Sequence, residues 1–86
     1  MKMICESTGS ILNVDRHYIT RNFWEYYLEK PDKNGQAFGL VMGHETELGY
    51  VDLDEIKPHV ISSASPDKEE FYPAEGWQWQ KNKVLN

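Results

Sequence analysis

The fold is decided by residues 37–53, AFGLVMGHETELGYVDL. This stretch holds two short apolar runs, AFGLVMG at 37–43 and LGYVDL at 48–53, separated by the polar residues HETE. Short apolar runs bounded by glycine and polar residues are typical of strands. The stretch therefore predicts two antiparallel strands and a tight turn. Gly39 and Gly43 lack side chains, so a ring or a backbone segment can approach closely there.

The flanking residues define how this unit begins and ends. PDKNG at 31–35 predicts a hairpin turn, because Asn and Gly accept positive φ. Downstream, Asp52 can cap a helix and Pro58 cannot continue one, which predicts a single helical turn near Leu53–Lys57. Residues 1–14 suggest an opening hairpin, or a strand followed by a loop.

Residues 15–30 fit either a helix or a strand. The helical spacing i, i+4, i+7, i+8 is met by apolar residues, and Asn22 followed by Glu25 could form a capping box. The run FWEYYL at 23–28, however, is rich in aromatic residues that favour strands. A strand here and a long helix across Arg16–Lys30 both remain open.

These elements together predict an α+β fold with an antiparallel β-meander and one short helical turn. The 86 residues suit one domain, expected at 1–80, with 81–86 as a flexible tail. The single cysteine, Cys5, excludes an intrachain disulfide, and no signal peptide or membrane-spanning stretch is readable. We therefore expect a cytoplasmic protein that does not bind membranes.

Acidic residues dominate the middle of the chain. The net charge is −5, and no Lys or Arg occurs between Lys33 and Lys57. This balance argues against a nucleic-acid partner. The acidic segment is either a solvated surface or a docking site for a basic protein. The candidate binding residues there are Glu45, Glu47, Asp52, Asp54 and Glu55.

Two tryptophans near the C-terminus form a second candidate binding surface. Trp77 and Trp79 are two residues apart, so on a strand they share one face. The simpler interpretation is that they pack in the core. The alternatives are that they anchor a protein partner or stack on single-stranded nucleic acid.

Catalytic patterns are weak throughout the chain. Cys5 with His17 is conceivable as a reactive pair, but the neighbours of Cys5 suggest a structural thiol. No ligand spacing typical of zinc or calcium sites occurs, and no phosphate-binding loop or nucleophile motif is present. We therefore predict no metal, no cofactor and no catalytic residue, although an enzyme is not excluded.

Residues 38–56, FGLVMGHETELGYVDLDEI, resemble the motif FGLV-x-G-x-E-x-ELGY-F-S-L-x-E-L of an uncharacterised bacterial domain family found on plasmids and other mobile elements. The matching positions are residues 38–41, Gly43, Glu45, residues 47–50, Leu53 and Glu55, whereas Val51, Asp52 and Ile56 depart from it. The resemblance implies a strand–turn–strand–helical-turn unit, a mobile-element setting and no assigned activity. An aromatic strand precedes the motif in that family, which favours a strand at 24–29.

Three functional hypotheses follow, in order of preference. The first is a non-enzymatic interaction module of a phage or mobile element that docks its acidic surface on a host protein complex. The second is a weak single-stranded nucleic-acid binder, and the third is a small metal-dependent enzyme. A homodimer is also possible, because a small sheet can leave an edge strand free for self-pairing.

Overall fold

Strands make up most of the regular structure in the described part of the chain. The computed structural model describes residues 1–65 and 76–80, of which 56% lie in strands. The expected α+β class is therefore wrong, and the protein is mostly β. Its helical content in these ranges is one turn, α1 (Leu53–Ile56), continued by a 3₁₀ turn, η1 (Lys57–His59). Neither has the length and apolar character that a membrane crossing requires.

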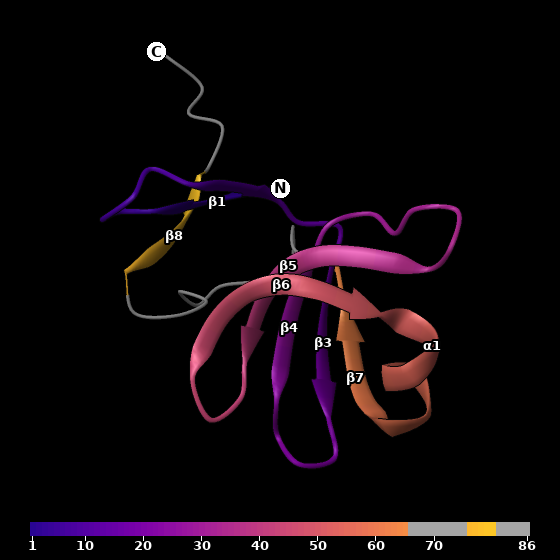
Figure 1. Ribbon diagram of the computed structural model, residues 1–86. Coiled ribbons are helices and arrows are strands. Elements are labelled where there is room, and N and C mark those ends of the chain that lie inside the picture. Colours follow the sequence, from indigo (N-terminus) through magenta and orange to yellow (C-terminus); the bar gives the residue numbers. More distant parts are fainter. Residues whose placement is uncertain (66–75, 81–86) are drawn as a thin grey trace.

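The larger of two sheets has five antiparallel strands in the order β6-β5-β4-β3-β7. Four of them form a meander in chain order, and β7 returns past α1 and η1 to pair with β3 (Figure 1). The expected strand pair around residues 37–53 is confirmed as β5 and β6. The bounds are β3 (Arg16–Thr20), β4 (Glu25–Leu28), β5 (Gln36–Met42), β6 (Thr46–Asp52) and β7 (Val60–Ala64).

The smaller sheet has three antiparallel strands in the order β2-β1-β8. It lies toward one end of the larger sheet (Figure 1). β1 (Lys2–Cys5) and β2 (Ile11–Asn13) form the expected opening hairpin, and β8 (Trp77–Gln80) pairs with the other edge of β1. The N-terminal strand therefore pairs with the last strand of the described residues. The tail expected at 81–86 lies outside the described residues.

Two hydrophobic clusters cover the two faces of the large sheet. The first joins the small sheet to one face of the large sheet through Met3, Leu12, Val14, Tyr27, Leu40 and Trp77. The second lies on the opposite face, where α1 contributes Leu53, and includes Tyr26, Leu28 and Ala37. β5 contributes to both clusters, which explains its continuous apolar sequence.

Residues 15–30 form a β-hairpin, so the alternative helix across Arg16–Lys30 is wrong. The polar residues that suggested a capping box have other partners. Thr20 Oγ1 donates to Asn22 Oδ1 at 2.6 Å, within the turn between β3 and β4. A hydrogen bond of 2.9 Å joins Glu25 Oε1 to His17 Nε2 across the two strands.

The two predicted turns around the β5–β6 unit are confirmed. Asp32 Oδ1 accepts hydrogen bonds from the backbone N–H of Asn34 at 2.8 Å and of Gln36 at 3.0 Å, and Gly35 adopts a φ of 80°. Asp52 Oδ1 caps α1 by accepting from Asp54 N at 2.9 Å. These local contacts fix where β5 starts and where β6 stops.

The close approaches expected at two glycines are also present. A Cβ on Gly43 would lie 2.7 Å from the Trp24 ring. A Cβ on Gly39 would collide with the carbonyl oxygen of Tyr27 and lie 2.8 Å from Leu28 Cα. Gly39 is buried in the centre of β5, and the backbone of the paired strand β4 lies so close to it that no side chain fits.

Replacement of Gly39 by alanine should lower the free energy of unfolding by about 1–3 kcal/mol, because backbone atoms of β4 must move to admit the new methyl group. The matched control is Gly49→Ala on the paired strand, directly opposite Gly39, where a Cβ meets nothing within 4 Å. The control should stay within about 0.5 kcal/mol of the wild type in urea unfolding. Equal losses for the two variants would contradict this account.

Candidate functional site

The five acidic candidates divide into two groups at opposite ends of β6. Glu45 lies in the turn before the strand and Glu47 near its start, both exposed. Asp52 ends the strand and caps α1, which carries the exposed Asp54 and Glu55. Since β6 has seven residues, the groups are separated by roughly 20 Å along the strand. The structure therefore places the two acidic groups at opposite ends of one strand, and they do not form one cluster.

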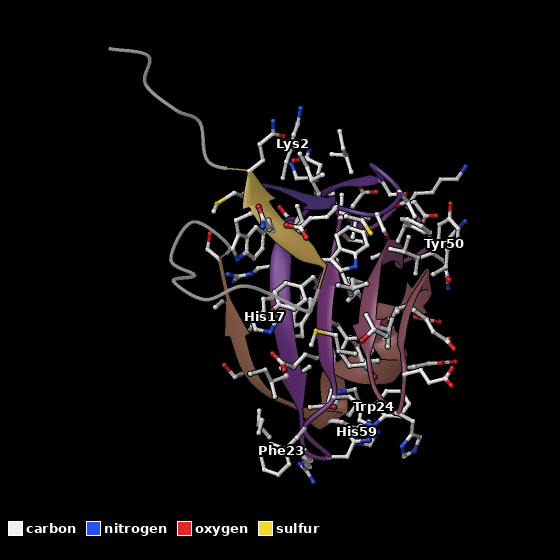
Figure 2. All side chains as sticks on the ribbon, turned by 90° about the vertical axis from the view of Figure 1, so that its left-hand side faces the viewer. Lys2, His17, Phe23, Trp24, Tyr50 and His59 are labelled. Atoms are coloured by element: carbon white, nitrogen blue, oxygen red, sulfur yellow. The ribbon has the colours of Figure 1, made fainter. Side chains whose placement is uncertain are left out.

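Apolar side chains occupy the strand between the two acidic groups. Leu48 is 43% exposed and Tyr50 is 74% exposed. Tyr50 meets the half-buried Phe38 edge to face, with ring centroids 5.1 Å apart, and projects from the flank of the molecule (Figure 2). The sequence analysis missed these two residues because LGYVDL has the apolar character of a buried strand.

The outer edge of β6 is open within the described residues. β6 pairs with β5 on its inner side. On its outer side no described strand pairs with it, and its backbone N–H and C=O groups point outward. Edge strands are commonly protected by charged side chains, above all Lys, by Pro or by a bulge. The charges within β6, Glu47 and Asp52, lie near its two ends. β6, with the sequence TELGYVD, contains neither Lys nor Pro, and its register with β5 is continuous. We refer to this edge, with Leu48, Tyr50 and the five acids, as the β6 edge.

The two tryptophans occupy the core between the sheets. Trp77 is 7% exposed and belongs to the first hydrophobic cluster. Trp79 is half-buried against the same cluster and meets Tyr27 edge to face, at a centroid distance of 5.7 Å. A base needs an open ring face for stacking, and these packed rings offer little.

His17 is also held by packing. Its ring stacks on Tyr27 at a centroid distance of 4.0 Å and an interplanar angle of 11°, besides its hydrogen bond to Glu25. Over residues 1–65 and 76–80, no group of three or more His, Cys, Asp or Glu side chains could hold a metal ion.

Cys5 is half-buried against the first cluster, and its sulfur is polarised by the turn that follows β1. Sγ lies 3.4 Å from Ser7 Oγ. Hydrogen bonds from Ser7, and secondarily from Thr8, favour the thiolate and lower the pKa of Cys5 from 9.0 to about 7. The thiol is thus part of the packing yet more acidic than an ordinary cysteine.

Comparisons with known proteins found no matching protein-family model. No curated protein and no solved structure matches the chain either.

Alkylation of Cys5 should follow a thiolate titration with a midpoint near pH 7. Because the Ser7 hydrogen bond is the largest cause of the lowered pKa, Ser7→Ala should raise the midpoint toward 9.0. Rates of alkylation by iodoacetamide, measured by mass spectrometry, check this expectation over a range of roughly two pH units on either side of the midpoint. Ser63→Ala, in β7, is the matched control and should leave the midpoint unchanged. A wild-type midpoint near 9 would refute the assignment.

Proposed function

We propose that this chain is a non-enzymatic protein-interaction module of the phage or mobile-element kind, which binds an extended basic segment of a host protein as an added strand on the β6 edge. The observation that carries the proposal is an open edge strand whose exposed Leu48 and Tyr50 lie between two groups of carboxylates.

An added strand explains the two kinds of exposed group on β6. In strand addition, backbone hydrogen bonds supply affinity, and alternate side chains of the bound segment supply specificity. Leu48 and Tyr50 lie on one face of β6 and offer the apolar contacts. The seven residues of β6 can pair with a segment of similar length.

The acidic ends select the charge of the partner. Glu45 and Glu47 at one end, and Asp54 and Glu55 at the other, lie in a segment without Lys or Arg. A basic segment gains electrostatic attraction at both ends of β6, whereas an acidic segment is repelled. A second copy of the chain would bring the same acids to the same edge, so the charge disfavours self-pairing of β6.

A basic partner suggests the biological role. Proteins that hold nucleic acid do so largely through Lys and Arg, because each phosphate contact releases counterions. A module that occupies such a basic segment competes with nucleic acid for it. We therefore propose that the chain modulates or inhibits a nucleic-acid-processing complex of the host.

Tagged protein purified from bacterial lysate, with and without nuclease, tests the proposal. We expect a stoichiometric protein partner that survives nuclease and is lost from the double variant Glu45→Lys/Glu47→Lys, because reversal at one end of β6 turns attraction into repulsion. The interaction should also weaken in salt above about 0.3 M, where exposed charges are screened.

The control bait is Glu6→Lys/Asp15→Lys, which makes the same change in net charge at exposed positions outside β6. It should retain the partner. Retention by all three baits, or the absence of any partner, would argue against the β6 edge. Recovery of nucleic acid with the wild type would instead favour the nucleic-acid hypothesis, and a β6-dependent homodimer would favour self-pairing.

A further inference from the structure

Phe23 occupies a backbone position that suits glycine. In the connection between β3 and β4, Phe23 N donates to Thr20 O at 2.8 Å and Thr20 N donates to Trp24 O at 3.0 Å. Phe23 has a φ of 65° and is the sole non-glycine residue with positive φ in residues 1–65 and 76–80. Hairpin loops of this kind place Gly or Asn at such a position, because a Cβ makes the left-handed conformation unfavourable.

The Phe23 ring is also 77% exposed, more than any other large hydrophobic residue of the described chain. Burial of the ring therefore does not offset the backbone strain. The positive φ and the exposure of the ring both make phenylalanine unfavourable for folding at this position. An observed outlier of this kind supports a role outside the fold.

An apolar cleft lies beside this strained turn. Its lining residues come from two segments, the β3–β4 hairpin and the α1–η1 turns: Thr20, Arg21, Asn22, Tyr26, Ile56 and His59. The two walls are joined by a hydrogen bond from Arg21 N to His59 O at 2.9 Å. Figure 2 shows Phe23 and His59 at the same end of the molecule, opposite Lys2. The cleft is thus preformed, and Phe23 directly follows two of its lining residues.

The inner part of the cleft is apolar and held by the core. Tyr26 is buried and Ile56 packs against the second hydrophobic cluster. Burial raises the pKa of the Tyr26 hydroxyl, partly opposed by its hydrogen bond to Thr20. An apolar side chain entering the cleft would therefore contact the apolar surfaces of Tyr26 and Ile56.

Side chains that can donate hydrogen bonds to a carboxylate, and no carboxylate, line the cleft. Arg21 and His59 line the cleft and are exposed, whereas the two exposed acids of the neighbouring turn, Asp54 and Glu55, are not among its lining residues. Arg21 can engage a carboxylate with two hydrogen bonds, and His59 adds a donor. An occupant with an apolar side chain next to acidic residues matches both the interior and the rim.

We propose that this cleft, with Phe23 as its exposed anchor, is a second binding site that takes an acidic extended peptide segment of a partner protein through one apolar side chain. The site does not depend on the function proposed for the β6 edge. Phe23 stacks on the bound apolar side chain, and Arg21 and His59 pair with the flanking carboxylates.

Two matched sets of synthetic nonapeptides test the site by backbone amide shifts of the ¹⁵N-labelled protein. Each peptide has Leu, Ile, Phe, Trp or Pro at its centre and Ser with Glu elsewhere, and the second set has Lys in place of Glu. We expect the Glu set to shift amides of residues 20–23, Ile56, Lys57 and His59 and to bind about tenfold more tightly than the Lys set. Phe23→Asn should weaken binding about tenfold or more while the unfolding midpoint stays equal or rises.

Arg21→Glu should also weaken the Glu set, and the matched control Ile11→Thr, which removes an exposed apolar side chain from β2, should not. Glu45→Lys/Glu47→Lys should retain Glu-set binding, which separates this site from the β6 edge. The proposal is overturned by absent shifts in the cleft, by equal binding of the Lys set, or by a lower unfolding midpoint of Phe23→Asn. Sedimentation showing self-association that Phe23→Asn abolishes would assign the cleft to a second copy.

Discussion

Strand β5 lies between two hydrophobic clusters, and the placement of the other elements follows from this double burial. Leu40 packs toward the small sheet, whereas Ala37 packs toward α1. A strand covered on both faces cannot vary much in side-chain size, and at Gly39 it admits no side chain at all. The small sheet therefore covers one face of β5, and α1 covers the other.

This constraint explains why the centre of the fold could be predicted from sequence. A strand buried on both faces has a continuous apolar sequence. The apolar run at 37–43 therefore predicts a strand that is covered on both faces. The adjoining turns are encoded locally as well, since Asp32 and Asp52 each accept a hydrogen bond from a backbone N–H two residues on. No long-range information is needed to place these features.

The predicted α+β class rested on one helical turn, and α1 has only four residues, whereas 56% of the described residues lie in strands. The ambiguity of residues 15–30 between helix and strand has a separate, local cause. The β3–β4 hairpin has Phe23 where such a turn usually has Gly or Asn, so the strongest sequence signal for a hairpin is missing. Without that signal, the helical spacing of residues 19–27 competes with their strand propensity. Trp77 and Trp79 were ambiguous for a different reason. Their burial depends on pairing with Cys5 and Met3, from the other end of the chain, which no local pattern encodes.

The candidate sites show the same limit, because charge is visible in a sequence and exposure is not. The acidic residues near β6 were identified, but their division into two groups and the exposed Leu48 and Tyr50 between them depend on β6 being an edge strand. At the β3–β4 hairpin the sequence departs from what the turn favours, and departures from local rules in a folded chain concentrate where function requires them. Phe23 is such a departure, since its conformation and its exposure both oppose folding. The residue that obscured the β3–β4 hairpin in the sequence is thus one whose presence folding does not explain, and the proposed binding site would.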